Sequence, residues 1–584
     1  SALRIEEVEG GRYVFAEVFE KGRPTVEVLA EELPKLLATI KFGKAMRWND
    51  SQVAFSRPLR WFVALLGEAV VPFTYAGVAS GNITRGLRPY GSPLFNVRNV
   101  EEYLASLKHQ GIMLDRDERR EQILVGARRL AHEAGGTLIV DEALLDEVAN
   151  LVECPTPFVG TFAEASLELP APVLITVMRK HQRYFAIQGE NGLLPKFIAV
   201  RNGDREHLDQ VIAGNEAVLR ARYADAAFFF AEDRKKPLAA FLPRLSTLTF
   251  HEKVGSMLDK NNRVVGLVAV LGELLGMNAD TLSIAEQAAQ VMKADLATQM
   301  VVEMTSLQGV MGREYALREG YPPLVADAIF EHWLPRSADD SLPNTPAGIL
   351  LALADRLDTL VSLFAVGLAP KGNADPFGLR RAALGVVQIL THHAIDLDLT
   401  VALERVARAQ SIEVSVESRQ TLADFIRGRL EGWLTEHDHA HDVMVAVLAE
   451  QAHNPTRALA GIQQLGTWVQ QPDWETTLDS FARCIRITRN ETTLYTVDPS
   501  AFVEQAERRL HDALTQAHAT LTATDNVGAF LQVFAPLVPI ITDFFNEVLV
   551  NAEEPQVRQN RLGLLQQVGL LARGRADMSQ LSGF

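Results

Sequence analysis

Three residues of types that bind divalent metals follow one another along the chain: His251 in LTFHEKVGSM, Asp295 in VMKADLATQM and Asp355 in LALADRLDTL. Imidazole and carboxylate groups that converge from neighbouring helices can hold a metal ion. The residue before the middle aspartate is Ala294, whose methyl group cannot be a ligand. The three positions predict either a weak site for one metal or a helical scaffold whose polar side chains hydrogen-bond one another.

The order of these residues resembles that of HD-type metal-dependent phosphohydrolases, in which a second histidine directly precedes the middle aspartate. Loss of one direct ligand normally destroys a site that depends on geometry. We therefore interpret His251, Asp295 and Asp355 as degenerate HD positions and expect no metal. An active HD-type metal-dependent phosphohydrolase is the alternative function.

Two basic segments, VMRKHQRYFAI and KFIAVRNGDR, contrast with a chain whose net charge is −16. The window from Arg179 to Arg205 contains six basic residues and two acidic ones. The basic residues are Arg179, Lys180, Arg183, Lys196, Arg201 and Arg205, and the acidic ones are Glu190 and Asp204. The neighbouring Tyr184 and Phe185 are of types that stack on unpaired bases. The segments predict either a nucleic-acid contact, with Arg179, Lys180 and Arg183 as phosphate ligands, or the solvated face of a sheet.

A third basic pair, Arg380 and Arg381, lies in the segment KGNADPFGLRRAALG. The Gly- and Pro-containing loop is expected to start a helix, with the two arginines in its first turns. Early backbone N–H groups together with guanidinium groups suit phosphate. The alternative is that both arginines pair with acidic residues of a neighbouring helix.

The whole chain has the composition of a large globular protein. It has 584 residues, of which 47% are hydrophobic and 22% are charged, so several domains are expected. Two distant cysteines, Cys154 and Cys484, exclude a disulfide scaffold and favour a reducing, cytoplasmic location. We expect no membrane span and no signal peptide, because the apolar runs are short and the first residues alternate like a strand.

The pattern of apolar residues changes near residue 238. Before that point, segments such as GRYVFAEVFEKG, RPLRWFVALLG and PKFIAVRNG are typical of strands, with a helix expected at 118–134 between them. After it, apolar residues recur at helical spacing to the end of the chain, including a last helix at 556–573. The fold class is therefore multidomain α+β, with a mixed α/β region followed by an all-α region.

Several nucleotide and hydrolase motifs do not occur in the sequence. There is no G-x-x-x-x-G-K-[ST] loop, no G-x-S-x-G elbow and no H-E-x-x-H pair. Nothing in the sequence predicts a self-sufficient ATP site.

A series of segments resembles one family in collinear order. They include FGKAMRWNDSQVAFSRPLRWFVALLG, MRKHQRYFAI, GNEAVLRARYADAAFFFAEDRKKPL, HEKVGSMLDK, EHWLPRSADDSLPNTPAG, KGNADPFGLRRAALG and RQNRLGLLQQVG. The chain resembles the β subunit of bacterial heterotetrameric glycyl-tRNA synthetase over nearly its whole length. That family usually has about a hundred further N-terminal residues before the GRYVFAEV region, and the initial Ser suggests a chain that begins inside a longer one.

The resemblance implies a domain plan. Residues 1–240 would form a B3/B4-like α+β domain, and residues 241–395 a degenerate HD-like helical domain. Residues 396–475 would be a helical body-tail or linker region. Residues 476–584 would be a helical anticodon-binding domain of the DALR-like type.

The resemblance also implies the division of labour in a glycine–tRNA ligase. This chain would be the non-adenylating subunit of an α2β2 heterotetramer and would bind tRNA-Gly, while ATP, Mg²⁺ and glycine would be used on the α subunit; no catalytic residue or cofactor is expected on this chain. Arg558, Asn560 and Arg561 are then candidates for the anticodon, because amide and guanidinium groups suit base edges and phosphates. Arg179, Lys180, Arg183, Arg380 and Arg381 are candidates for the acceptor arm.

The B3/B4-like domain also raises the possibility of editing. Editing is needed where a smaller or isosteric amino acid enters the synthetic site, and glycine is the smallest. We therefore expect a binding scaffold in this domain. A further hypothesis is a pure assembly protein that makes no contact with RNA.

Overall fold

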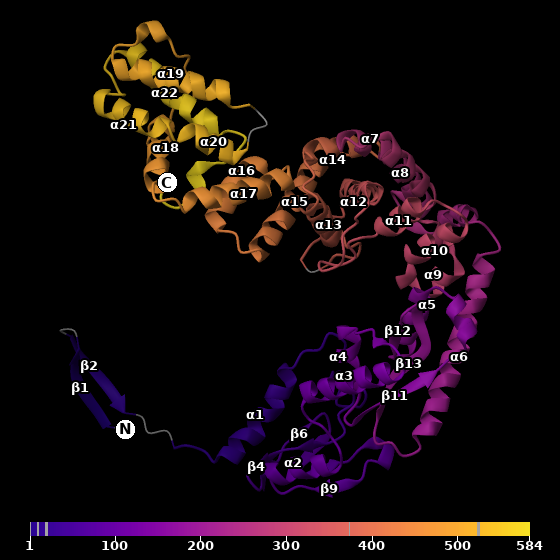
Figure 1. Ribbon diagram of the computed structural model, residues 1–584. Coiled ribbons are helices and arrows are strands. Elements are labelled where there is room, and N and C mark those ends of the chain that lie inside the picture. The colour runs from indigo at the N-terminus through magenta and orange to yellow at the C-terminus, as the bar shows by residue number, and fades with distance from the viewer. Residues whose placement is uncertain (1, 9–10, 18–20, 373, 523–525) are drawn as a thin grey trace. The chain divides into compact units, whose positions relative to one another are not determined.

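The computed structural model describes residues 2–8, 11–17, 21–372, 374–522 and 526–584. These form two compact units, Ser1–Phe228 and Phe229–Phe584, whose elements are labelled in Figure 1. The first unit mixes helices and strands, and the second is almost entirely helical, which confirms the broad α+β arrangement. The division lies near the predicted boundary at residue 240, and the boundaries at 395 and 475 stay predictions.

A four-stranded antiparallel sheet in the order β10–β12–β13–β11 supports the first unit. Its strands are β10 (Thr137–Leu138), β11 (Pro155–Thr161), β12 (Phe185–Gly189) and β13 (Gly192–Asn202). Helix α3 (Arg116–Glu133) packs on it, and α4 (Glu142–Leu151) packs on α3 and shares the same core cluster. Ile123, Ala127 and Ala131 follow at four-residue spacing on one face of α3 and are buried with Ile187 and Ile198 of the sheet. The predicted helix at 118–134 and strand in PKFIAVRNG are therefore confirmed.

The other elements of the first unit are short or lie outside this sheet. The helices are α1 (Thr25–Thr39), α2 (Val100–His109), α5 (Ala171–Val177) and α6 (Leu208–Asp233), which runs past residue 228. The strands are β1 (Ala2–Val8), β2 (Gly11–Glu17), β3 (Phe62–Val63), β4 (Leu65–Leu66), β5 (Ala69–Val70), β6 (Thr74–Tyr75), β7 (Val78–Gly81), β8 (Ile83–Arg85) and β9 (Leu94–Asn96). Strand β2 confirms the alternation in GRYVFAEVFEKG, whereas part of its predicted turn, residues 18–20, lies outside the described residues.

The second unit begins with helices arranged around α12 (Pro346–Ala365), most of whose residues are buried. Around it lie α7 (Met257–Leu274), α8 (Ala279–Val291), α11 (Pro323–Glu331) and α13 (Leu379–His392). The same region contains β14 (Thr249–His251), β15 (Gly255–Ser256), α9 (Gln299–Glu303) and α10 (Val310–Arg318). A capping box between Ser256 and Asp259 starts α7 and so fixes its first turn.

Helices continue to the end of the chain. The next group consists of α14 (Leu399–Arg408), α15 (Val416–Glu436), α16 (His441–Gln451) and α17 (Pro455–Val469). The last group consists of α18 (Trp474–Thr488), α19 (Gln505–Thr520), α20 (Val527–Phe534), α21 (Leu537–Glu547) and α22 (Pro555–Ala572). Helix α18 packs on α22, and α19 packs on α21 and α22. The helix predicted at 556–573 is confirmed as α22.

The helical spacing that continues after residue 238 does not correspond to an unbroken helix at one place. The periodic segment AEQAAQVMKADLATQMVVEM is not continuous, because α8 ends at Val291, a 3₁₀ turn covers Ala294–Ala297, and α9 begins at Gln299. The Thr298 side chain accepts a hydrogen bond from Val301 N–H and donates one to the Asp295 carbonyl. Asp295 therefore lies in a tight turn between helices rather than on a helix face.

No single helix within the described ranges is long and apolar enough to cross a membrane. The pair α20 and α21, bent by 49°, meets the criteria of length and composition only.

Candidate functional site

A buried lysine lies against one of the predicted metal-ligand positions. Lys293 Nζ is 3.0 Å from Asp355 Oδ1 and 3.1 Å from His332 Nε2, and it lies 3.9 Å from the centre of the Trp333 ring. His332 Nδ1 is 2.6 Å from the Ile329 carbonyl, so Nδ1 donates there and Nε2 accepts from the lysine. Burial, and next the Lys293 charge, hold the pKa of His332 well below its usual value, so the ring is neutral.

Asp355 has a second ammonium partner. Lys260 Nζ is 3.0 Å from Asp355 Oδ1 and 3.1 Å from Asp358 Oδ2. Arg263 also pairs with Asp358, at 2.7 Å. Burial disfavours the charged form of Asp355, but Lys260 and then Lys293 outweigh it and lower its pKa. The carboxylates of α12 are therefore neutralised by side chains of this chain itself.

Asp295 is fully buried, and its carboxylate accepts hydrogen bonds from backbone N–H groups. Its Oδ2 accepts hydrogen bonds from Gly309 N–H at 2.6 Å and Gly312 N–H at 3.1 Å, while its Oδ1 has no hydrogen-bond partner. A Cβ at Gly312 would lie 3.2 Å from Asp295 Oδ2, so the missing side chain allows this approach. Burial raises the pKa of Asp295 to about 6, against the opposing effect of these N–H groups.

The residues present do not fit the metal that an HD-type site implies. His251 packs its ring edge-on against Phe377, 6.0 Å between centroids, and Asp295 and Asp355 are engaged as described. No group of three or more His, Cys, Asp or Glu that could hold a metal occurs within the described residues. An ammonium group lies at Asp355, where a metal would need free carboxylate oxygen. This donor set argues against the active HD-type phosphohydrolase.

The first basic segment forms a π-helical turn, η3 (Met178–Gln182), at the end of α5. Arg179 pairs with Asp141 at 2.8 Å and Arg183 with Glu147 at 2.9 Å, so both guanidinium groups have acidic partners while remaining about half exposed. The Lys180 ammonium is exposed and has no ion-pair partner among the described residues. Lys180 is therefore the most available cation of the predicted three.

Arg222 of α6 adds to this segment and was missed in the sequence. Burial first, then Arg222, Lys180 and Arg183, lower the pKa of His181. The three cations therefore create a positive potential at η3. The only sequence signal was the Arg pair in LRARYAD, which reads equally well as a solvated helix face.

The prediction that Tyr184 and Phe185 stack on bases is wrong. Tyr184 is 5% exposed and Phe185 is 3% exposed. Tyr184 stacks on Phe197, 4.5 Å between centroids, and burial raises its pKa to about 12. Both rings are buried by packing: Tyr184, directly before β12, lies against Phe197, and Phe185, the first residue of β12, belongs to the core cluster under α3. The available side chains at this place are therefore cationic.

Arg380 and Arg381 begin α13, as predicted, although residue 373 of the preceding loop lies outside the description. Asp375 accepts hydrogen bonds from the N–H groups of Leu379 and Arg380 at 2.8 and 2.9 Å. The Arg380 guanidinium donates to the Gly372 carbonyl. The Arg381 side chain is exposed and has no carboxylate partner within the described ranges. The two arginines thus differ: one is tied to the loop and the other is available.

The three anticodon candidates also separate. Asn560 and Arg561 are 4% and 6% exposed; Asn560 bonds to the backbone of Asp498, and Arg561 pairs with the buried Glu507 at 2.7 Å. Direct contact of these two with RNA would require them to leave those partners. Arg558 is 40% exposed and pairs with Glu491 at 2.7 Å. Only Arg558 of the three is accessible on the bundle.

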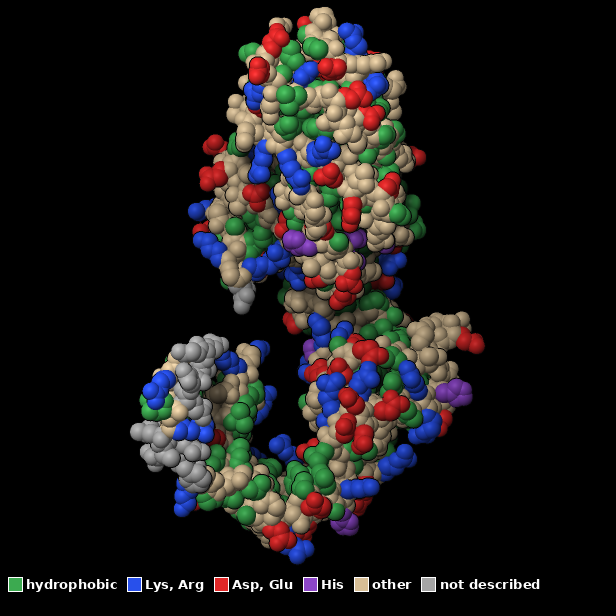
Figure 2. Space-filling model, turned by 90° about the vertical axis from the view of Figure 1, so that its left-hand side faces the viewer, with side chains coloured by type: hydrophobic (Ala, Val, Ile, Leu, Met, Phe, Trp, Pro, Cys, Tyr) green, Lys and Arg blue, Asp and Glu red, His purple; other side chains and the backbone are tan. Residues whose placement is uncertain are grey.

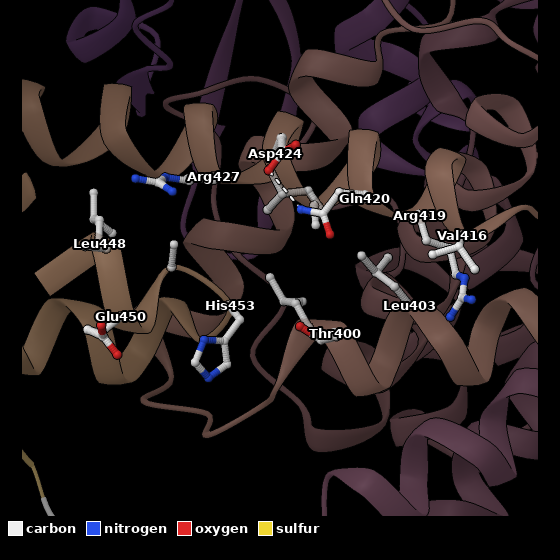
Figure 3. Close-up of a pocket in the computed structure, with 15 residues that line it drawn as sticks. Thr400, Leu403, Val416, Arg419, Gln420, Asp424, Arg427, Leu448, Glu450 and His453 are labelled. Carbon is white, nitrogen blue, oxygen red and sulfur yellow. Dashed lines mark hydrogen bonds between the residues drawn. The ribbon is translucent and has the colours of Figure 1, made fainter. Parts of the chain in front are cut away.

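A further cavity of about 280 Å³ lies in the region predicted as body-tail or linker (Figure 3). Its walls come from α14, α15 and α16 and from residues that follow them, and include Leu403, Asp424 and Glu450. Asp424 accepts from Gln420, and Glu450 accepts from Gly574 N–H. The carboxylates of Asp424 and Glu450 are therefore already hydrogen-bonded, and they do not form an acid–base pair suited to proton transfer.

Figure 2 shows the distribution of charge on one face of the molecule. Lys and Arg side chains are interspersed with Asp and Glu, rather than gathered in one extended basic surface. A chain of this net charge must use local groups of cations to contact an anionic polymer.

Comparison with known proteins identifies the chain's relatives. The family model described as glycyl-tRNA synthetase beta subunit matches residues 1–449. A glycine–tRNA ligase beta subunit from Desulforamulus reducens is 40% identical over 588 residues, covering 99% of this chain and 84% of that protein. The corresponding Myxococcus xanthus protein is 39% identical over 98% of this chain and 83% of its own length.

A plant relative is longer. The Arabidopsis thaliana protein named glycine–tRNA ligase, chloroplastic/mitochondrial 2, is 43% identical over 575 residues. The match covers 98% of this chain, and the chain spans about half (54%) of that protein.

A chain that is similar over nearly its whole length to glycine–tRNA ligase beta subunits is a component of an aminoacyl-tRNA synthetase. It belongs to the glycyl-tRNA synthetase beta subunit family.

Proposed function

We propose that this chain is the tRNA-binding subunit of a glycine–tRNA ligase. It captures tRNA-Gly by its anticodon and acceptor arm and presents the 3′ end to a separate α subunit, in an α2β2 heterotetramer. The α subunit makes glycyl-adenylate from glycine and ATP, with Mg²⁺, and transfers glycine to the tRNA. The observation that carries this proposal is the match to beta subunits over 98–99% of the chain.

The residues of the chain support a binding role rather than bond-making chemistry. The sequence has no phosphate loop for ATP. The only HD-like carboxylate near solvent, Asp355, is neutralised by two lysines. The chain therefore contributes position and affinity, and the adenylate chemistry is assigned to the α subunit.

Three groups of cations are assigned to the two ends of the tRNA. At the acceptor arm, Lys180 and Arg222 at η3 and Arg381 at α13 offer cations for phosphate. At the anticodon, Arg558 on the C-terminal bundle offers a guanidinium group that can exchange Glu491 for a base edge or a phosphate. Because an Arabidopsis relative is named chloroplastic/mitochondrial, the cytoplasmic location stays a prediction.

The test is tRNA-Gly binding by the complex of this chain with the α subunit, measured over a salt series. Lys180→Glu with Arg222→Glu should lower affinity at least tenfold, and the loss should shrink as salt rises, because phosphate contacts are screened. Lys108→Glu, on the exposed side of α2, is the matched control in the same unit. Equal affinity of the double variant and the control would contradict the assignment of the acceptor arm to η3.

A further inference from the structure

A cavity of about 380 Å³ lies next to the Lys293 cluster, at the beginning of α13. His332, Trp333, Asp355, Arg356, Phe377 and Arg381 are among the residues that line it. All of these belong to the second unit. The cavity falls within the size range of small-molecule sites.

The walls of this cavity carry an excess of positive charge. Three arginines and one aspartate line it. The aspartate, Asp355, is already paired with Lys260 and Lys293, and Arg336 is paired with Asp340 at 2.7 Å. Arg356 and Arg381 thus have no carboxylate partner among the described residues.

Arg356 makes this excess significant because it is buried. It is 7% exposed, and its donors go only to backbone carbonyls, those of His332, Ala352, Trp333 and Pro335. Burial lowers its pKa to about 10, which leaves it charged. Asp355 and Asp340 act on this charge only from a distance, without an ion-pair contact. A buried charge that no carboxylate contacts is costly, and an anion in the cavity would offset that cost.

The start of α13 holds Arg381 at the rim of the cavity. Gly378, the N-cap residue, has φ +66°, and a Cβ there would lie 2.8 Å from Arg381 Nη2. Glycine therefore both permits the left-handed turn and leaves space for the guanidinium group. The rings of Trp333 and Phe377 add flat apolar surface beside these cations.

We infer that this cavity binds the phosphate monoester of a nucleotide. Arg381 and Arg356 supply two positive charges for the dianion, and Trp333 and Phe377 supply surface for the base. We assign this nucleotide to the 5′ terminus of tRNA, an assignment that rests on the proposed function. The 5′ end carries a phosphate monoester, whereas the 3′ end ends in the hydroxyl that accepts glycine. A free mononucleotide has the same chemistry and is the other source.

The experiment compares tRNA-Gly with a 5′-phosphate and tRNA-Gly with a 5′-hydroxyl, bound to the complex of this chain with the α subunit. The wild type should prefer the phosphorylated tRNA about tenfold, the effect expected of a charge-assisted contact. Arg381→Gln should abolish that preference. Arg380→Gln is the matched control: it removes the neighbouring charge, but its guanidinium is bound to Gly372 and does not line the cavity, so the preference should remain.

A second arm measures AMP binding to the same proteins by calorimetry. AMP binding that is lost in Arg381→Gln, without any 5′-phosphate preference, would confirm the ligand class and overturn the tRNA end as its source. No preference and no Arg381-dependent AMP binding would overturn the inference. A complex that binds no tRNA at all would contradict the proposed function, and the AMP arm would still decide the cavity.

Discussion

At the scale of single residues, Lys293 determines what the degenerate HD site can do. Its ammonium group lies 3.0 Å from Asp355 and is 1% exposed. A fixed cation inside the protein neutralises Asp355 without any metal. The same lysine lies beneath the Trp333 ring and so supports a wall of the cavity.

We predict that Lys293→Met destabilises the region around α12 by about 2–4 kcal/mol, because it leaves Asp355 with one cation and His332 with an unpaired nitrogen. Hydrogen exchange of peptides from α12 measures this local stability. Lys253→Met, at an exposed position in the turn between β14 and β15, is the control. Equal exchange in the two variants would show that the buried ammonium is not structural.

Asp295 predicts a dependence of stability on pH. Its folded-state pKa of about 6 lies above the value near 3.9 of an unfolded aspartate, so the unfolded chain releases the proton first. The stability that the protonated carboxyl contributes is fully present below about pH 4 and is lost as pH rises through about 6. Relative to Asp295→Asn, the wild type should lose about 1 kcal/mol of unfolding free energy between pH 5 and pH 7. A difference that does not change with pH, in denaturant titrations, would contradict the burial-driven shift.

Sequence and structure agree on some of these residues and differ on others for identifiable reasons. The sequence showed that Ala294 stands where a metal ligand would be needed. It did not show that the Lys293 ammonium neutralises Asp355 instead of a metal, because only the tertiary fold brings the Lys293 side chain to Asp355. Arg558 and Arg561 are near neighbours in sequence. Three residues apart on α22, their side chains lie only about 60° from each other around the helix axis. Arg558, in the first turn, nevertheless stays partly exposed beside Glu491, whereas Arg561 is covered through its ion pair with Glu507 of α19.

At the scale of elements, the entry to α13 matters most for the cavity. Asp375 accepts the first two helical N–H groups, and Gly378 makes the turn that precedes them. The Gly- and Pro-containing segment KGNADPFG predicted this loop and the helix that follows it. It could not predict which arginine the loop would engage, because that depends on the path of residues before the helix.

We predict that Asp375→Ala loosens the first turn of α13 by about 1 kcal/mol, since the helix loses its side-chain acceptor. Asp375→Asn keeps only one of the two oxygen acceptors, so it should cost less than the alanine variant but more than nothing. Hydrogen exchange of the peptide that begins α13 gives both values. A protected first turn in the alanine variant would mean that the Asp375 carboxylate does not stabilise it.

The break between α8 and α9 shows the limit of pattern analysis. Apolar spacing continues smoothly through Met292 and Leu296, so the sequence favours one helix. Hydrogen bonds from Gly309 and Gly312, distant in sequence, hold Asp295 in the turn instead. Tertiary contacts override local preference here, and a single sequence gives no sign of them.

At the scale of the whole molecule, a chain with net charge −16 is assigned to an anionic partner. An acidic chain can still bind an anion, because small groups of cations, such as those at η3 and at α13, act locally. On the face drawn in Figure 2, Lys and Arg side chains are mixed with Asp and Glu. The motif series predicted the family correctly. The division of work between subunits does not follow from this chain alone, because the reacting atoms are assigned to its partner.

The most direct test of the account is glycylation of tRNA-Gly by the α subunit with and without this chain, measured beside glycine-dependent exchange of pyrophosphate into ATP. We predict that the α subunit alone supports the exchange but charges tRNA only when this chain is added. Equal charging with and without the chain would contradict the proposal that this chain captures the tRNA and presents its 3′ end.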